Sequence, residues 1–443
     1  MDWIEGNEAL LFLFLKQGSV STDSRSLAEG AIFFGLRGEH FDGNVYAEGA
    51  LENGAAYVVI DDVRYHKPGD SRYILTENSL RALQDLGRDY RRMLAIPVLG
   101  ITGSNGKTTT KELIASVLKT ERRVFATKGN LNNHIGVPLS LLAIPQDAEI
   151  AIIEMGANQP DDIKELAEIA EPTHGLITNI GKAHLERLKG IEGVKKVKGQ
   201  LFDFIRNHGG TVFINLADAN VIDVANGIEK RITYGADNAD FVYTIRRQTL
   251  EEMMVVVSSR FWEGEAVFPA RLTGEYNAHN IVAAIAVGQY FGISLAKIQE
   301  GIYAYLPVNH RSQIIQKPHF TIWMDAYNAN PSSMKAAIQH IFDTNKGKKI
   351  ALMLGDMFEL GAESEKEHKA LGDFVRTFSP ALTVWVGKEL HFAFDKSNAN
   401  EAYFEKFEEL PLDIHGVLMA VSAEVVLIKG SRGMALERVL ERI

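Results

Sequence analysis

The sequence predicts an α/β protein of three domains. Short apolar segments alternate with helical stretches along most of the 443 residues, which is the pattern of parallel sheets covered by helices. At roughly 150 residues per domain, this length corresponds to about three domains, each large enough to bury its own core. A glycine-rich loop at residues 100–110, between an apolar strand and a helical stretch, predicts that the central domain binds phosphate.

The first domain is predicted to span residues 1–95. The segment MDWIEGNEALLFLFLKQG carries acidic residues where a signal peptide needs basic ones, and its apolar run from Leu10 to Leu15 is much shorter than a bilayer span of roughly 20 residues. We therefore expect a first helix, no membrane span and a cytoplasmic protein. Three strands and a connecting helix are then expected at AIFFGL (31–36), AAYVVID (55–61), SRYILT (71–76) and Ser79 to Met93.

The second and third domains are predicted at residues 96–307 and 308–443, with Pro307 at the boundary. The expected strands of the second domain are IPVLGIT (96–102), EIAIIEM (149–155), GLITNI (175–180) and TVFINL (211–216), followed by a β-rich stretch around MMVVVSSRFW (253–262) and a helix from Asn277. Those of the third are FTIWMDA (320–326), KKIALML (348–354), LTVWVG (382–387) and EVVLIKG (424–430). The chain has no repeat of fixed period, which argues against a solenoid.

Composition excludes several classes of function. The chain has no cysteine, so disulfides, cysteine metal sites and thiol nucleophiles are absent. A net charge of -10 repels polyanions, and we expect no nucleic-acid partner, although a local cationic pocket for phosphates is compatible with this charge.

The loop GITGSNGKTTT has the residue types of a phosphate site but not the usual spacing. The pattern G-x-x-x-x-G-K-[ST] would place its first glycine at Ile101. Backbone N–H groups of the loop and the start of a helix at Thr109–Leu118 would cradle an anion. Lys107 would reach the terminal phosphates and the Thr108 hydroxyl would bind Mg²⁺. The alternative, a plain glycine turn before a helix, does not require Lys-Thr directly after the glycine.

Two further residues follow predicted strands of the same domain. Glu154 lies at the end of the strand EIAIIEM, and His184 lies just past the end of GLITNI. A lone Glu or His in a loop is usually only solvated, but ligands of open α/β sheets bind outside the carboxyl ends of the strands. We therefore expect both side chains to face the crevice of the phosphate loop.

The segment GVKKVKGQLFDFI contains three lysines that helical geometry separates. An apolar face is formed by Val194, Val197, Leu201, Phe204 and Ile205, and Lys198 lies within it, whereas Lys196 points away and Lys195 is at its edge. Desolvation favours the neutral amine, which can add CO₂ to form a carbamate. The alternative is a lysine whose stem covers apolar surface while its head reaches water.

The loop TGSNGKTTT resembles the compact phosphate loop of the Mur ligase family, in which the glycines are closer together than in the general pattern. The resemblance implies ATP and two Mg²⁺ ions as cofactors, with Glu154 and His184 as metal ligands. It also implies that Lys198, in the pattern G-V-x-x-x-K-G, is carbamylated and helps to position the second Mg²⁺. Gln200 departs from the family, where a Glu is frequent. The implied ATP-binding loop residues are Gly103, Ser104, Asn105, Gly106, Lys107, Thr108 and Thr109.

Other segments extend the resemblance over nearly the whole chain. STDSRSLAEGAIFFGLRGEHFDG is similar to a nucleotide-sugar segment of the family, and TKGNLNNHIGVPLSLL is similar to a stretch near the reacting groups. The resemblance implies that the UDP end of the substrate is held in the first domain and the peptide end in the others. The implied substrate-binding residues are Ser24, Arg25, Phe41, Asp42, Gly43, Asn132, Asn133, Tyr327 and Asn328.

The remaining nucleotide contacts are implied by segments of the second and third domains. In GEYNAHNIVAAIAVG, Asn277 and Asn280 match adenine-contacting positions, with Tyr276 in place of a more usual His; an N-capped helix is the plain alternative for Asn277. In MDAYNANPSSMKAA, Asp325 matches the acid that binds the ATP ribose, while Ala326 departs from the usual Ser or Thr. Arg311 resembles an arginine that reaches the γ-phosphate, although His310 precedes it where the family has Gly.

Within the family, LGDMFELG and VLIKGSRGM resemble the ligase that adds D-alanyl-D-alanine to UDP-N-acetylmuramoyl-tripeptide, and no D-N-P-R motif of the sibling ligases is present. The implied reaction is ATP-dependent amide formation through an acyl phosphate, by a protein expected to be a monomer. The alternatives are a related Mur-type or folylpolyglutamate-type amide ligase, or a nucleotide-binding regulator without the chemistry. Whether the tripeptide ends in diaminopimelate or lysine stays open.

Overall fold

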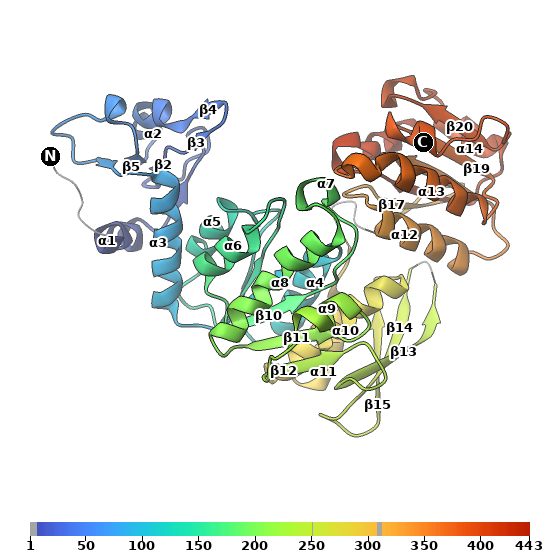
Figure 1. Ribbon diagram of the computed structural model, residues 1–443, viewed down its shortest axis with the longest axis horizontal. Helices are drawn as coiled ribbons and strands as arrows, with labels where there is room; N and C mark the ends of the chain where they lie inside the picture. The colour runs from blue at the N-terminus through green and yellow to red at the C-terminus, as the bar shows by residue number, and fades with distance from the viewer. Residues whose placement is uncertain (1–6, 250, 308–311) are drawn as a thin grey trace.

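The computed structural model describes residues 7–249, 251–307 and 312–443. Three sheet-containing bodies follow one another along the chain, and we call them the first, central and third bodies. Figure 1 shows the first body (blue) and the third body (orange to red) at opposite ends of the central body (green to yellow). The predicted α/β class is confirmed. The domain limits at 95/96 and 307/308 stay predictions.

The first body is built on a parallel sheet in the order β1-β2-β5-β6. All three strands predicted for this part of the chain are confirmed, as is the helix after them. The strands are β1 (Val20–Ser21), β2 (Ile32–Phe34), β5 (Tyr57–Ile60) and β6 (Tyr73–Leu75), with a separate antiparallel pair β3 (Arg37–Gly38) and β4 (Phe41–Asp42). The helices are α1 (Asn7–Gln17), α2 (Ala47–Glu52) and α3 (Ser79–Leu94).

Helix α3 joins the first body to the central body (Figure 1). It begins where the Asn78 side chain accepts a hydrogen bond from the backbone N–H of Arg81, and it ends at Ala95, whose φ is +52°. Close packing against the central body depends on Gly87, because a Cβ there would lie 3.0 Å from the Cα of Pro138. Helices α3 and α5 can therefore approach each other at this point.

The central body contains a nine-stranded sheet in the order β15-β14-β13-β12-β11-β10-β7-β9-β8. Strands β7 to β12 are parallel, and β13, β14 and β15 form an antiparallel extension. The strands are β7 (Val98–Thr102), β8 (Val124–Ala126), β9 (Ile150–Glu154), β10 (His174–Ile177), β11 (Thr211–Asn215), β12 (Arg231–Tyr234), β13 (Phe241–Gln248), β14 (Met253–Ser259) and β15 (Glu265–Ala270).

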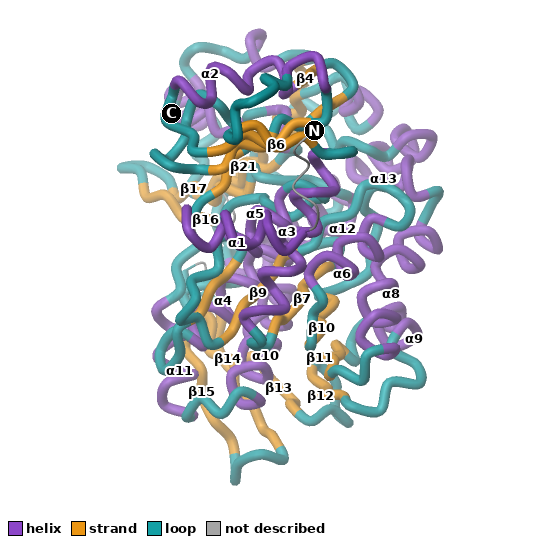
Figure 2. The backbone as a smooth tube through the Cα atoms, turned by 90° about the vertical axis from the view of Figure 1, so that its left-hand side faces the viewer, coloured by secondary structure: helices purple, strands orange, loops and turns teal. Residues whose placement is uncertain are grey.

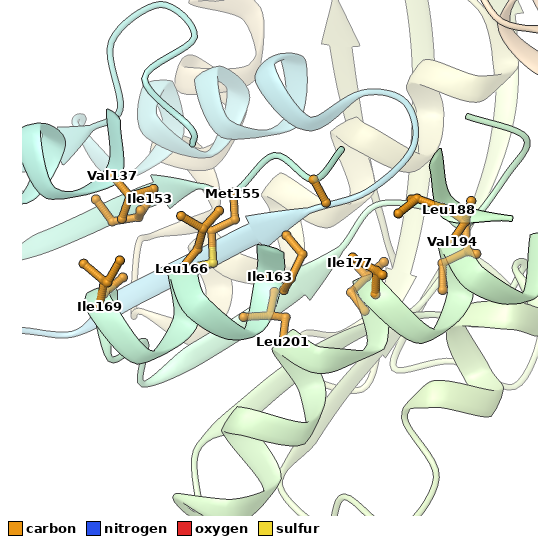
Figure 3. Packing of buried hydrophobic residues seen from close by; sticks show 14 of the residues in the cluster. Val137, Ile153, Met155, Ile163, Leu166, Ile169, Ile177, Leu188, Val194 and Leu201 are labelled. Carbon is orange, nitrogen blue, oxygen red and sulfur yellow. The ribbon is translucent and has the colours of Figure 1, made fainter. Parts of the chain in front are cut away.

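Helices cover both faces of the central part of this sheet, which explains why β7, β9 and β11 are buried at every residue. Along β9, Ile152 belongs to a buried cluster that includes residues of α4, α10 and α11, whereas Ile153 belongs to a second cluster that includes residues of α5, α6 and α8. Figure 2 shows α4 and α11 on one side of the central strands and α6 and α8 on the other, and Figure 3 shows Leu166 and Leu201 facing Ile153 and Ile177. The helices are α4 (Lys107–Leu118), α5 (Gly136–Leu142), α6 (Asp162–Ala170), α7 (Leu185–Leu188), α8 (Ile191–Asn207), α9 (Ala219–Val224), α10 (Glu275–Tyr290) and α11 (Leu295–Ala304).

The third body contains a six-stranded sheet in the order β16-β17-β21-β18-β19-β20, parallel except for the edge strand β16. Its four predicted strands are confirmed. The elements are β16 (Gln313–Gln316), β17 (Thr321–Asp325), β18 (Ile350–Gly355), β19 (Leu382–Val386), β20 (Glu401–Phe404), β21 (Val425–Lys429), α12 (Pro331–Thr344), α13 (Ser364–Arg376) and α14 (Ile414–Ala420). Across the described residues, no helix combines the length and apolar character that a membrane span requires.

Candidate active site

A cavity of about 920 Å³ lies at the carboxyl ends of β7 and β9, between the central and third bodies. Most residues that the sequence predicted for the nucleotide and the reacting groups line this cavity: Ser104, Asn105, Gly106, Lys107, Thr108, Thr109, Asn132, Asn133, Glu154, His184, Asn277, Asn280, Asp325, Tyr327 and Asn328. Gly103 and Lys198 are not among its lining residues, and neither are the five predicted residues of the first body. Arg311 and His310 lie outside the described residues.

The phosphate loop requires glycine at two positions. Gly106 has φ +77° and caps α4, so the helix begins at Lys107, two residues before the predicted start. Gly103 has φ +153°, and a Cβ there would lie 1.8 Å from the Thr178 hydroxyl oxygen. The Lys107 ammonium folds back over the loop and donates to the Gly103 carbonyl at 2.7 Å. The first residues of α4, whose backbone N–H groups have no acceptor within the helix, line the cavity, as an anion site requires.

The segment after β10 holds the loop in place, through residues that were not predicted from the sequence. The Asn105 carbonyl accepts from the Thr178 hydroxyl at 2.6 Å and from the Asn179 amide at 2.9 Å. From the third body, the Asn330 amide donates to the Asn105 side-chain oxygen at 2.6 Å. Asn330 belongs to the segment AYNANP, whose resemblance to the family was the available signal. The loop is thus held by both bodies that form the cavity.

Glu154 lies beneath the loop with only 2% of its surface exposed. Its carboxylate accepts from the Thr108 hydroxyl at 3.0 Å and from the Asn132 amide at 2.9 Å. Two oxygen ligands on adjacent corners of a Mg²⁺ octahedron lie about 2.9 Å apart, so the Thr108 and Glu154 oxygens fit a shared Mg²⁺. Among the described residues no group of three His, Asp or Glu could cage a metal. Mg²⁺ in nucleotide sites is usually held by one or two carboxylates together with phosphate and water.

His184 lines the cavity but is bound by the third body. It caps α7 in the left-handed region, with φ +53°, and its Nδ1 lies 2.5 Å from the Glu359 carboxylate. This contact with the His184 ring lowers the pKa of Glu359 below its usual value. Glu359 also has a positive φ, +63°. Two non-glycine residues in a sparsely populated conformation meet here, which is typical of functional positions.

Lys198 is buried on α8 with 1% of its surface exposed. Burial lowers the pKa of its ammonium well below the usual value, and the charge of Lys107 lowers it further. In the described part of the chain its ammonium has no hydrogen bond or ion pair. The predicted apolar face of the helix is confirmed at Val194, Val197, Leu201 and Ile205, all buried, while Phe204 is half-buried, Phe202 is fully buried, Lys195 pairs with Asp223 and Lys196 is exposed.

Asn277 and Asn280 form a buried chain of amides between α10 and α4. The Asn277 amide donates to the Thr273 carbonyl at 2.6 Å, the Asn280 amide donates to Asn277 at 3.0 Å, and the Asn280 oxygen accepts from the Thr110 hydroxyl at 3.0 Å. The interpretation of Asn277 as a helix cap is wrong, because α10 begins at Glu275 with Gly274 as its cap.

Asp325 lies at the end of β17 beside a lysine that was not predicted as a site residue. Its Oδ2 lies 2.5 Å from the buried Lys429 ammonium, which also donates to the Asn328 carbonyl at 3.0 Å. Its Oδ1 accepts from the backbone N–H of Ser312 at 3.0 Å. Across the cavity, the Tyr276 hydroxyl lies 3.1 Å from the Ser312 hydroxyl, and burial raises the pKa of this phenol. The signal for Lys429 was its place in VLIKG.

The structure does not bring the predicted first-body residues to the cavity. Arg25 is exposed and pairs with Asp23, and Phe41, 54% exposed, stacks on Tyr46 with ring centroids 5.6 Å apart. The Ser24 carbonyl accepts from Asn53, and the Asp42 carboxylate accepts from the backbone N–H of Asn44. Gly43 packs so closely that a Cβ would lie 2.6 Å from the backbone of Leu36. These residues form a separate surface on the first body.

A phosphate loop, a buried carboxylate beside its threonine and a cavity shared by two bodies together define a nucleotide-dependent enzyme. Three family descriptions match the chain: "Mur ligase family, catalytic domain" at residues 18–91, "Mur ligase middle domain" at 101–288, and "Mur ligase, glutamate ligase domain" at 310–432. The chain belongs to the Mur ligase family.

Relatives are similar along almost the whole length. The UDP-N-acetylmuramoyl-tripeptide--D-alanyl-D-alanine ligase of Bacillus subtilis is 36% identical, with 95% of this chain and 92% of that protein covered. A crystal structure of MurF from Acinetobacter baumannii has a TM-score of 0.86 at 29% identity, covering 95% of this chain and 92% of that one. MurF ligase from Thermotoga maritima in complex with ADP has a TM-score of 0.85 at 25% identity, covering 97% of both chains.

Proposed function

We propose that the protein is an ATP-dependent ligase that adds D-alanyl-D-alanine to UDP-N-acetylmuramoyl-tripeptide, in the cytoplasm and as a monomer. The observation that carries the proposal is the cavity in which the phosphate loop, the Thr108–Glu154 pair and the third body meet. Relatives with this activity in their names match nearly the full chain, which supports the choice of substrates.

In the proposed reaction, the tripeptide carboxylate attacks the γ-phosphate of ATP and releases ADP. The amine of D-alanyl-D-alanine then attacks the acyl phosphate, and the amide forms as phosphate leaves and a proton is lost. Two anions meet in the first step, so the loop N–H groups and the Lys107 ammonium act by neutralising and positioning them. Thr108 and Glu154 would hold Mg²⁺, which would supply further neutralisation of the phosphate charge.

Other residues of the cavity have proposed roles in the same reaction. We propose that Asn277 and Asn280 flank the adenine and that Asp325 binds the ribose. His184 would join the metal site once its contact with Glu359 is released. Asn132, Asn133, Tyr327 and Asn328 would contact the peptide substrates, and Arg311 the γ-phosphate. These assignments are supported by the cavity, because every one of these residues that the structure describes lines it.

For the UDP end of the substrate, the proposed site is the first-body surface that includes Ser24, Arg25 and Phe41–Gly43. The exposed Phe41 ring is suited to stack on a base. Phe41→Ala should weaken binding of the UDP-tripeptide in calorimetry while binding of ADP stays unchanged. Equal affinity of the variant and the wild type for UDP-tripeptide would remove Phe41 from the site.

Lys198 is proposed to carry a carbamate, formed when its neutral amine adds CO₂ and loses a proton. The burial of the amine, which lowers its pKa, supports this assignment. Lys198→Ala should be nearly inactive, and formate or acetate should restore part of the activity by placing a carboxylate in the vacated space. Lys196→Ala, on the exposed side of the helix, is the matched control. An active Lys198→Ala enzyme would contradict the carbamate.

The decisive experiment is phosphate release with ATP, Mg²⁺, D-alanyl-D-alanine and each UDP-tripeptide in turn. The ligase is expected to release phosphate only when both substrates are present, and the preferred tripeptide identifies the third residue. A folylpolyglutamate-type ligase would instead turn over with a folate and glutamate, and a regulator would turn over with neither set of substrates.

Lys107→Ala should abolish turnover, because the change removes the charge that neutralises the phosphates. The variant should still fold, because the change removes no core volume.

A further inference from the structure

A buried ion pair joins helix α4 to Glu154, which lines the cavity. Lys111 and Glu154 each have 2% of their surface exposed, and the Lys111 Nζ lies 3.6 Å from the Glu154 Oε2. Removing two charges from water is costly, and a buried pair is weak evidence for stability by itself. Stability alone therefore does not explain why α4 has a buried lysine at position 111.

The Lys111 ammonium is fixed by a second contact. It donates to the Thr127 carbonyl at 2.6 Å. Thr127 in turn accepts, through its hydroxyl, the backbone N–H of Glu154 at 3.0 Å. The lysine thus links α4, the residue after β8 and the end of β9, and it cannot leave Glu154 without breaking a buried hydrogen bond.

Three groups hold the Glu154 carboxylate from different sides. Oε1 accepts from the Asn132 amide, whereas Oε2 faces both the Thr108 hydroxyl at 3.0 Å and the Lys111 ammonium. The carboxylate therefore has one orientation, with Oε2 beside the other proposed Mg²⁺ ligand. Its charge, however, is already balanced by Lys111, and Lys107 adds a second positive charge at the loop.

We propose that Lys111 is a positioning residue and a built-in counter-charge, which fixes the Glu154 carboxylate for a divalent cation while preventing tight binding of that cation without nucleotide. The proposal rests on the metal site of the proposed function. Without nucleotide, a cation would approach a Glu154 carboxylate whose charge is already balanced by Lys111. A nucleotide adds its phosphate charges, and the cation then gains the ligands and the attraction that the protein alone withholds.

The test measures binding of free Mn²⁺ by calorimetry and by electron paramagnetic resonance, with and without ADP. The wild type should bind free Mn²⁺ weakly, on the order of 1 mM, and far more tightly when ADP is present. Lys111→Met removes the counter-charge at similar volume. This variant should bind free Mn²⁺ at least about tenfold more tightly than the wild type, and bound Mn²⁺ should raise its thermal stability.

Two controls accompany this variant. Lys119→Met removes an exposed charge from the end of the same helix and should behave as the wild type. Lys111→Met combined with Glu154→Gln should lose the added affinity.

Each outcome decides the proposal. It is overturned if the wild type binds free Mn²⁺ as tightly as in the presence of ADP, or if Lys111→Met leaves the affinity unchanged. If Lys111→Met folds only with Mn²⁺, the counter-charge is supported, and if it never folds, the wild-type comparison decides. The ligase activity is measured separately on the wild type by phosphate release. A failure there rejects the proposed reaction and leaves the cation result intact.

Discussion

We predict that the burial of His340 lowers the free energy of unfolding in mild acid. It lies on α12 of the third body and is buried between this helix and the central body. Its Nδ1 lies 3.0 Å from the Gln248 amide nitrogen and its Nε2 lies 3.1 Å from the Thr273 hydroxyl. A neutral ring satisfies both contacts, accepting one hydrogen bond and donating the other. Burial lowers the pKa of His340 to about 4.

The sign of the effect follows from the two states. Below an ordinary histidine pKa of about 6.5, His340 takes up a proton in the unfolded chain but stays neutral in the folded chain. The contribution of His340 to the free energy of unfolding is therefore complete above pH 6.5 and is lost as the pH falls towards 4. At 1.36 kcal/mol per unit of pKa difference, lowering the pH from 7 to 5 should cost about 2 kcal/mol of the free energy of unfolding.

Urea unfolding at pH 7 and pH 5, followed by tryptophan fluorescence, measures this loss. Trp323 packs on the His340 ring with centroids 4.8 Å apart, so the signal includes this region. The wild type should lose about 2 kcal/mol more than His340→Gln between the two pH values. His391→Gln, which changes an exposed histidine of the same body, should keep the wild-type pH dependence. Equal losses in the wild type and His340→Gln would refute the reasoning.

Two further changes probe the core and the contact between bodies. Leu201→Ala should reduce the free energy of unfolding by about 3 kcal/mol, measured by denaturation, because this side chain is fully buried beneath β7. Lys182→Ala leaves the Glu367 carboxylate, 4% exposed, without its cation from the central body. Small-angle scattering should then show a larger radius of gyration than the wild type, and an unchanged radius would mean that this pair does not hold the bodies together.

The fold could be predicted where strands are buried on both faces. The segments around β7, β9 and β18 are continuous apolar runs, because helices cover both sides of their sheets. The short strands β8, β12 and β20 were missed. In β20 (Glu401–Phe404) every residue is only half-buried, and a strand of three or four residues is too short to show a periodicity that distinguishes it from a loop.

The site could be predicted where its chemistry is local in sequence. The loop follows β7 directly and Glu154 is the last residue of β9, and strand ends meet at one edge of a parallel sheet. Partners distant in the chain could not be derived in this way. Asn105 meets Asn330, and Asp325 meets Lys429, across 225 and 104 positions. His184 was predicted at the cavity, but its contact with Glu359 depends on how two bodies pack.

The unusual glycine spacing of the loop has a structural cause that leads to a last prediction. The general pattern would place a glycine at Ile101, but Ile101 lies inside β7 with its side chain fully buried in the core. Ile101→Gly restores the general pattern at the expense of that packing. It should lower the free energy of unfolding by about 4 kcal/mol, through a core cavity and a glycine in a strand. Affinity for ADP, measured by calorimetry below the melting temperature, should not rise, because the turn is already made by Gly103 and Gly106. Tighter binding of ADP by this variant would mean that the loop begins within the strand and that the compact spacing is a defect rather than a consequence of where β7 ends.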